Sequence, residues 1–258
     1  MKIVVCVKHC PDAQGERTFT EDHTTDRSVD GLLSELDEYA VEQALQIVEA
    51  SEGEIVALTM GPDDALDAVR KALQMGAGSG VHVNDEAIAG SDAPATSLVL
   101  AKAIEKIGDV DLVLTGMSST DAAMAVVPAM LAERLSLPQV TLASALKVDG
   151  GTVTITRDGD VSSQTIQASL PAVVSVTDHT GEARYPNMKG ILAAKKKKVE
   201  NWTLDDLGVD ASQVGLAAAW TAVESTTARP PRQAGQIVTD EGDGGVKLAE
   251  FLTAGKFV

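Results

Sequence analysis

Short runs of β-branched and other apolar residues recur along the chain, and segments with helical spacing separate them. The runs lie at 2–7, 54–59, 80–83, 110–115 and 171–176. Because these runs are apolar at successive positions, they are typical of parallel strands buried on both faces. Between the runs, apolar residues return every three or four positions, as from Leu36 to Val48 and from Leu98 to Ile107. The alternation predicts an α/β fold that is doubly wound around a mainly parallel, Rossmann-like sheet.

A different texture begins at Leu146, where apolar and polar residues alternate around two glycine-containing turn signals. Gly150-Gly151 and Asp158-Gly159 are typical of tight turns, so the segment 146–169 is predicted to be an inserted β-hairpin. The helical and strand alternation ends after Val176, and a Pro-rich connection follows at 225–236. We therefore expect an α/β domain over 1–224 and a C-terminal arm over 225–258, with a final helix in VKLAEFL.

The charge balance excludes one large class of partners. Asp and Glu number 38 against 21 Lys and Arg, and the net charge is −17. This is the opposite of what binding to a phosphate backbone requires, so nucleic acid is not expected as a partner. No apolar run approaches the length of about 18 residues that a membrane span needs. Cys6 and Cys10 offer no disulfide framework, and we expect a cytoplasmic protein that does not span a membrane.

The loops that leave the carboxyl ends of the predicted strands are the places to look for a ligand site. In a doubly wound sheet these loops start near Lys8, Met60 and Gly116. None of them carries G-x-G-x-x-G or a P-loop pattern. After Gly116 the residues from Ser118 to Asp121 are predicted to lead into a helix. Their hydroxyl and amide groups would suit a phosphate or a ribose, and equally well a helix N-cap without any ligand.

Residues suited to catalysis or to metal binding are sparse. The four histidines are scattered, and none has metal-ligand spacing. His9 lies beside Cys10, but no third residue is available to orient such a pair. We therefore expect no catalytic residue and no metal site. Lys195–Lys198 form either a solvated face or a contact with a partner, and the preceding segment displays apolar residues that are typical of docking.

Five motifs, in order along the chain, resemble those of the β subunits of electron-transfer flavoproteins. They are MKIVVCVKHCPD, LDEYAVEQAL, LTMGPDDALDAVRKALQMGAGSGVHV, TRDGDVSSQTIQASLPAVVSV and EARYPNMKGILAAKKKKVE. Together they extend the resemblance over essentially the whole length. The fold that the resemblance implies is similar to that of the adenine nucleotide α-hydrolases.

The resemblance implies an electron carrier subunit and no enzyme activity of the chain by itself. The chain would pair with an α subunit that holds most of an FAD, while the β subunit binds AMP as a structural cofactor. The heterodimer would carry electrons from acyl-CoA or related dehydrogenases, as in fatty acid β-oxidation, to a membrane quinone oxidoreductase.

The resemblance also implies which residues contact each partner. The AMP contacts would be Cys6, Ser34, Glu35, Leu36, Asp37, Met60, Gly116, Met117, Ser118, Ser119, Thr120, Asp121, Ala122, Ala123, Met124, Ala125, Val126 and Val127. The residues that face the flavin would be Ala13 and Leu36. The partner-recognition loop would be 184–194, with Tyr185, Met188, Ile191 and Leu192. The arm would pack on the α subunit.

The loop 116–127 departs from the pattern usual in these β subunits. A second Asp and a Gln are common where this chain has Ala123 and Val126. Two alternative functions stay open, the first of them because of this departure. One is a bifurcating flavoprotein subunit with a second FAD in place of AMP, and the other is a stand-alone adenine-nucleotide-binding protein of the universal-stress type.

Overall fold

A computed structural model describes residues 1–232, 234–235 and 237–258. The chain forms two compact units, Met1–Glu224 and Ser225–Val258. Gln233 and Gln236, which belong to the predicted arm, lie outside the described residues.

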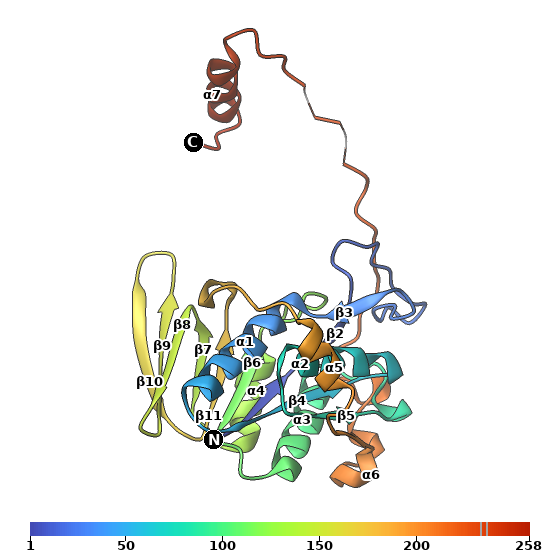
Figure 1. The fold of residues 1–258 in the computed structure, drawn as a ribbon. Helices are drawn as coiled ribbons and strands as arrows, with labels where there is room; N and C mark the ends of the chain where they lie inside the picture. Colours follow the sequence, from blue (N-terminus) through green and yellow to red (C-terminus); the bar gives the residue numbers. More distant parts are fainter. Residues whose placement is uncertain (233, 236) are drawn as a thin grey trace. The chain divides into compact units, whose positions relative to one another are not determined.

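The first unit is built on a parallel sheet of seven strands within the part of the chain that the structure describes (Figure 1). The strands lie in the order β12-β5-β4-β1-β6-β11-β7. Their bounds are Lys2–Cys6 for β1, Glu54–Met60 for β4, Ser79–Val83 for β5, Leu112–Gly116 for β6, Gln139–Ala143 for β7, Ala172–Val176 for β11 and Val199–Trp202 for β12. The predicted doubly wound α/β fold is confirmed, and each of the five predicted runs forms one of these strands.

Helices cover both faces of the sheet and bury a separate apolar layer on each (Figure 1). One layer contains side chains of α1 (Glu35–Ala50) and α2 (Leu66–Met75). The other contains side chains of α3 (Ala93–Ile107), α4 (Val127–Leu135) and α6 (Leu204–Leu207). Neighbouring strand residues alternate between the layers, as Ile3 and Val4 do, because successive side chains of a strand point to opposite faces. This explains why the strands are apolar at consecutive positions.

The strand order creates a switch point between β1 and β6. From β1 the chain builds outward through β4 and β5, and it then returns to place β6 on the other side of β1. The loops that leave the carboxyl ends of β1 and β6 therefore run toward opposite halves of the sheet. A crevice for a ligand is expected at such a point in this class of fold.

Two strands of the main sheet were not predicted from the sequence. Residues Val199–Trp202 form β12, and Gln139–Ala143 form β7. The predicted antiparallel segment contains three strands, one more than a single hairpin: β8 (Ala145–Asp149), β9 (Thr152–Asp158) and β10 (Ser163–Ser169). Its two turns lie where they were expected. Gly150 and Gly151 both have positive φ, of 55° and 81°, as a tight turn between twisted strands requires.

The prediction of a loop at 184–194 is wrong in part, because Met188–Ala194 form the helix α5. Asn187 caps this helix by accepting a hydrogen bond from the Gly190 backbone N–H at 2.9 Å. A Cβ at Gly190 would lie 2.4 Å from the carbonyl oxygen of Gln74 in α2. The sequence hides this helix because it is short and contains a glycine, and that glycine is what allows α5 to approach α2.

The basic run after α5 is not uniformly a solvated face. The Lys197 ammonium donates to the carbonyl oxygens of Leu73, at 2.9 Å, and Ala77, at 2.6 Å, so it satisfies carbonyl groups at the end of α2. Burial lowers the pKa of Lys197. Lys195, Lys196 and Lys198 remain exposed.

A small antiparallel pair completes the first unit, and one helix forms the second. β2 (His9–Pro11) pairs with β3 (Gly31–Leu33), and the loop 12–30 joins them. In the second unit, α7 (Gly244–Ala254) contains the predicted final helix and leaves Val246, Leu248 and Phe251 exposed. Among the described residues, none of the helices combines the length and hydropathy that a membrane span requires.

The close packing of α5 on α2 predicts a large effect for Gly190→Ala. The new methyl group would meet the Gln74 carbonyl oxygen at 2.4 Å, so α5 must move off α2. We expect the free energy of unfolding, measured by urea denaturation, to fall by about 1–3 kcal/mol.

Gly159→Ala is the matched control. Its Cβ would meet only Ser162 O at 3.5 Å, an ordinary contact, so a change within about 0.5 kcal/mol is expected. Equal losses in the two variants would contradict the packing of α5 described above.

Candidate functional site

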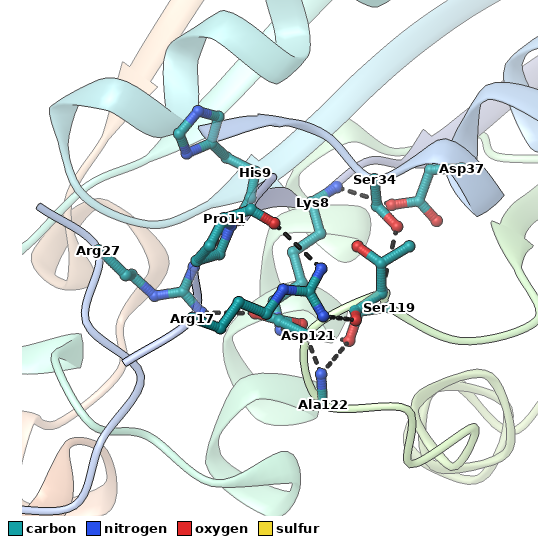
Figure 2. Close-up of polar contacts among 11 residues, drawn as sticks. Lys8, His9, Pro11, Arg17, Arg27, Ser34, Asp37, Ser119, Asp121 and Ala122 are labelled. Atoms are coloured by element: carbon teal, nitrogen blue, oxygen red, sulfur yellow. Dashed lines mark hydrogen bonds and ion pairs between the residues drawn. The ribbon is translucent and has the colours of Figure 1, made fainter. Parts of the chain in front are cut away.

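The carboxylate of Asp37 joins three segments at the switch point, and Figure 2 shows its contact with Lys8. Its Oδ2 accepts a hydrogen bond from the Lys8 backbone N–H at 2.9 Å, beyond the end of β1. Its Oδ1 accepts one from the Gly116 backbone N–H at 3.2 Å, at the end of β6. Asp37 itself lies in the first turn of α1. One side chain thus fixes the ends of both switch-point strands relative to a helix N-terminus.

The start of α1 is held by backbone contacts as well. The Ser34 N–H donates to the Lys8 carbonyl oxygen at 2.8 Å, and the Asp37 N–H donates to the Ser34 carbonyl oxygen at 2.8 Å. The Ser34 hydroxyl, which is fully buried, accepts from the Thr120 N–H at 3.4 Å. The β6–α4 loop is therefore connected to the same point as the two strand ends.

Burial dominates the ionisation of Asp37. The side chain is buried, and burial raises its pKa to about 7, although the two backbone N–H groups oppose this shift. A carboxylate at a helix N-terminus is favoured by the helix dipole. Asp37 is therefore a buried carboxyl whose pKa lies well above that of an exposed Asp.

Gly116 is required at its position by close contacts. A Cβ there would lie 2.6 Å from Asp37 Oδ1 and 2.7 Å from the Leu36 carbonyl oxygen. Any side chain would push α1 away from β6 and break the contact that Asp37 makes. The glycine that the sequence places directly after the strand serves the close approach of two backbone segments.

Cationic side chains surround a second buried carboxylate, Asp121 (Figure 2). Its Oδ1 lies 2.8 Å from the Lys8 Nζ, and its Oδ2 lies 3.0 Å from a guanidinium nitrogen of Arg27. Only 2% of the Asp121 side chain is exposed. Although burial alone would raise its pKa, the charges of Lys8 and Arg27 and the hydrogen bonds from Lys8 and Ser119 hold the pKa of Asp121 far below its usual range. Asp121 is therefore fully ionised at neutral pH.

Arg17 and Arg27 extend the β2–β3 loop over the β6–α4 loop (Figure 2). Arg27 also donates to the His9 carbonyl oxygen at 3.0 Å. Arg17 donates to the Pro11 carbonyl oxygen at 3.1 Å and to the Thr120 carbonyl oxygen. These contacts bring residues that are about a hundred positions apart in the chain to one edge of the sheet.

Apolar side chains lie beside this polar cluster. Cys6, Met60 and Val127 are partly buried, and all three pack against the same core layer. Cys6 ends β1, Met60 ends β4, and Val127 begins α4. The carboxyl edge of the sheet thus carries these apolar side chains together with a cationic rim, Lys8 and Arg27. This combination suits a ligand that has a base at one end and an anionic group at the other.

The prediction that Ser118–Asp121 lead directly into a helix is wrong. The helix α4 begins at Val127, and its N-cap residue Val126 makes no side-chain capping bond. The intervening loop is exposed at Ala122–Ala125, and Ala123 and Ala125 have left-handed φ angles of 51° and 57°. The hydroxyl residues therefore do not cap α4, and Asp121 serves as the partner of two cations.

The other residues of the predicted contact set vary in position. Glu35 is exposed, Leu36 and Met117 are half-buried, and Met124 is 59% exposed. Ala13, which was predicted to face a flavin, is exposed on the β2–β3 loop.

Cys6 and Cys10 lie in an environment that keeps their thiols protonated. Burial and the nearby Asp37 raise the pKa of Cys6 to about 12. Burial raises the pKa of Cys10 to about 11. Since the thiolate is the reactive form, these raised pKa values disfavour a nucleophilic role for either cysteine.

The predicted recognition residues lie on a different part of the fold. Tyr185, Met188 and Leu192 are 88%, 71% and 57% exposed, and Ile191 is half-buried. Arg184 anchors the segment before α5, because its guanidinium pairs with Glu42 at 2.7 Å and also with Glu49, both on α1. The pairing makes a bridge between α1 and the chain that leads to α5.

Sequence reasoning did not single out Lys8, Arg17 and Arg27 as site residues. Their partners lie 113, 103 and 94 positions away. No local pattern reports such pairs. The one available signal was two arginines in an otherwise acidic loop that follows a strand of the switch point.

Comparison with known proteins bears on this arrangement. A family model described as the electron transfer flavoprotein domain matches residues 23–207. The electron transfer flavoprotein subunit beta of Mycobacterium leprae is 45% identical over 263 residues, which cover 99% of this chain and 99% of the relative. That of Megasphaera elsdenii is 32% identical and covers 94% of this chain and 93% of the relative.

The chain belongs to the electron transfer flavoprotein family. Its similarity to β subunits extends over the full length, as the five sequence motifs predicted. Subunit CarD of the caffeyl-CoA reductase–Etf complex of Acetobacterium woodii is also similar, with 32% identity over 93% of this chain and 92% of the relative. The names of these relatives assign them to proteins that transfer electrons.

The position of Asp37 predicts a specific pH dependence for Asp37→Asn. Both oxygens of Asp37 accept hydrogen bonds from backbone N–H groups. In Asp37→Asn the NH2 group of the amide would face one of these N–H donors and leave it without an acceptor. We expect this to lower the free energy of unfolding by about 1–3 kcal/mol at pH 5. The folded pKa of about 7 exceeds the value of 3.8 of an unperturbed Asp. Between pH 3.8 and about pH 7, Asp37 keeps its proton in the folded wild type and has lost it in the unfolded chain. The free energy of unfolding of the wild type therefore falls as the pH rises through this range, and it is constant above the folded pKa.

Urea denaturation of both proteins at pH 5 and pH 8 measures this effect. The deficit of Asp37→Asn relative to the wild type should narrow by about 2 kcal/mol between the two values. A deficit that stays the same or grows with pH would contradict a raised pKa at Asp37.

Proposed function

We propose that this chain is the β subunit of a heterodimeric electron transfer flavoprotein and that the switch-point cluster binds AMP. The observation that carries the nucleotide site is the geometry around Asp121. A cationic rim of Lys8 and Arg27 lies beside apolar residues at the carboxyl ends of β1 and β4. Anions and adenine rings need these two kinds of surface next to each other.

The described residues fit AMP better than they fit a flavin. The Ser119 hydroxyl and the backbone N–H groups after β6 can bind phosphate or ribose oxygens. Cys6, Met60 and Val127 offer apolar surface for the adenine. Ala13 and Leu36 carry no polar side-chain atom, so they can cover a flavin ring but cannot hold it. In this proposal the α subunit holds most of the FAD, which supplies the redox chemistry of the complex.

The electron donors in this proposal are acyl-CoA or related dehydrogenases, and the acceptor is a membrane-associated quinone oxidoreductase. The docking surface for donors consists of Tyr185, Met188, Ile191 and Leu192 on and before α5. Three of these four apolar side chains are exposed, and exposed apolar groups on an anchored element favour docking of partners. Met188 can adapt to several partners because its thioether side chain is flexible and polarizable.

The second unit, 225–258, would be an arm that packs on the α subunit. Its helix α7 leaves Val246, Leu248 and Phe251 exposed, at 63%, 58% and 58%. A single helix cannot bury such a face by itself. The complex is expected in the cytoplasm, where Cys6 and Cys10, which form no disulfide, would stay reduced.

The nucleotide content of the purified heterodimer tests the proposal. The chain should be co-expressed with its α partner, and bound nucleotides should be released, separated and identified by mass. We expect one FAD and one AMP per heterodimer.

Two other outcomes would each replace the proposal. Two FAD molecules and no AMP would identify a bifurcating flavoprotein, which the apolar Ala123 and Val126 in the site leave open. No flavin, with ATP on this chain alone, would identify a stand-alone adenine-nucleotide-binding protein.

The docking surface predicts a kinetic effect for Met188→Ala in the heterodimer. Because Met188 is 71% exposed and free to contact a partner, its truncation should slow reduction of the complex by its dehydrogenase at least about fivefold without loss of flavin. Stopped-flow reduction measures the rate.

Val161→Ala is the matched control, since Val161 is 97% exposed at a turn outside the docking surface. Its rate should equal that of the wild type. If the dehydrogenase reduced the Met188→Ala heterodimer at the wild-type rate, as expected for Val161→Ala, Met188 would have no part in docking.

A further inference from the structure

One arginine attaches the docking surface to the body of the first unit. The stretch 181–186 lies between β11 and α5, and of its residues only Arg184 forms hydrogen bonds with the described part of the chain. Tyr185 follows Arg184 directly, and Met188 begins α5. The attachment therefore lies at the entrance to the docking surface.

The guanidinium of Arg184 binds two carboxylates of α1 with both sides of its planar fork. Its Nε donates to Glu42 Oε2 at 2.7 Å, and one terminal nitrogen donates to Glu42 Oε1 at 3.0 Å. The same terminal nitrogen donates to Glu49 Oε2 at 3.0 Å, and the other one donates to Glu49 Oε1. The Arg184 backbone N–H also donates to Glu42, at 3.2 Å. Two paired, charge-assisted contacts thus hold this side chain.

Glu42 is itself held in one place. Its side chain is only 7% exposed, and its Oε1 accepts a hydrogen bond from Gln46 Nε2 at 2.9 Å. Burial alone would raise its pKa, but the hydrogen bonds from Arg184 and Gln46 keep the pKa of Glu42 below its usual value. A largely buried carboxylate that stays ionised needs its cation close by. The position of Glu42 therefore dictates that of Arg184.

The other part of the docking surface is attached to α2, through the close approach of Gly190 and through Lys197. The helices α1 and α2 cover the same face of the sheet, and an ion pair between Lys71 and Glu38, at 3.4 Å, joins them (Figure 1). The docking surface is therefore attached twice, to α1 just before Tyr185 and to α2 along and after α5.

The attachment matters because the docking residues themselves contribute little to holding the segment. Three of their four apolar side chains are exposed, so packing against the rest of the unit fixes them only in part. A surface segment that a partner must first order binds more weakly than one that is already in place.

We propose that Arg184 is a positioning residue for donor docking, because its pairing with Glu42 and Glu49 holds Tyr185 and Met188 in the arrangement that a dehydrogenase binds. Arg184 acts through these residues and need not touch the partner, since four of the five N–H groups of a guanidinium are used on α1. This inference rests on the proposed function, because it concerns the docking surface proposed there.

The test measures reduction of the heterodimer by an acyl-CoA dehydrogenase of the same organism that its acyl-CoA substrate has reduced. Stopped-flow traces at increasing dehydrogenase concentration give the half-saturating concentration and the limiting rate. Dithionite reduces the flavin without docking, so its rate and the flavin content report on the flavin site alone. The variants are Arg184→Gln, Arg184→Lys, Met188→Ala and the double variant of Arg184→Gln with Met188→Ala.

Arg134→Gln is the matched control. Arg134 also joins two elements, since it donates to Ser97 Oγ at 2.8 Å and to the Pro94 carbonyl oxygen at 3.0 Å and so links α4 to α3. These helices cover the other face of the sheet. Like Arg184→Gln, the control should lower the free energy of unfolding in urea, but it should leave the half-saturating concentration unchanged.

Arg184→Gln should raise the half-saturating concentration at least about fivefold, because the partner must then order the docking surface. The limiting rate, the flavin content and the rate with dithionite should stay at their wild-type values. Arg184→Lys keeps the charge without the planar fork and should show a smaller increase. Arg184→Gln should have less effect in the Met188→Ala background than in the wild type, because both changes act through the same surface.

The results that would overturn the inference differ in what else they overturn. If Met188→Ala impaired docking while Arg184→Gln kept the wild-type half-saturating concentration, Arg184 would have no positioning role and the docking surface would stand. An equal increase in Arg134→Gln, an equal effect of Arg184→Gln in both backgrounds, or slower reduction by dithionite would also assign Arg184 a merely structural role. If neither Met188→Ala nor Arg184→Gln had an effect, the proposed docking surface would fail together with this inference.

Discussion

The arrangement of the site depends on one buried carboxylate that accepts backbone hydrogen bonds from two strands. Asp37 joins the chain after β1 to the end of β6 from the first turn of α1. β1 and β6 are neighbouring strands, but the chain leaves them toward opposite halves of the sheet, so contacts such as this one fix the two following loops relative to each other. The contact also requires Gly116, since a side chain there would occupy the place of the Asp37 carboxylate and the Leu36 carbonyl oxygen. Two residues that are far apart in the sequence are thus mutually necessary.

A second carboxylate, Asp121, organises the rim of the same site in a different way. Asp37 is buried against backbone N–H groups and has a raised pKa, whereas Asp121 is buried between Lys8 and Arg27 and has a strongly lowered one. Two acids at one sheet edge therefore have opposite electrostatic roles. Asp37 holds backbone segments together, and Asp121 holds cations in position. The site therefore combines backbone segments that Asp37 fixes with charged side chains that Asp121 positions.

The sequence predicts the centre of this fold far better than its edges. The five predicted strands are apolar at consecutive positions because helices cover both faces, as in Ala172–Val176, where every residue is buried. The missed strands, β7 and β12, lie at the two ends of the sheet, and both mix exposed and buried residues. Edge strands have no such continuous apolar signal. The helix α5 was missed for a related reason, since its stability comes from packing on α2 through Gly190 rather than from its own sequence.

The site residues likewise fall into those that local motifs predict and those that depend on long-range contacts. Asp37, Gly116 and Asp121 were named from the resemblance of local motifs, and the structure brings them together. Arg17 and Arg27 were not named, because their contacts depend on how a long loop folds back over the sheet.

Hydrogen–deuterium exchange of the nucleotide-free heterodimer, with and without added AMP, tests most directly whether the switch point between β1 and β6 is a nucleotide-binding site. Three segments should become protected together, namely 8–12, 34–37 and 116–121, while β8 to β10 should not change. Protection confined to other segments, or no protection at a saturating AMP concentration, would contradict the claim that these three segments form one nucleotide-binding site.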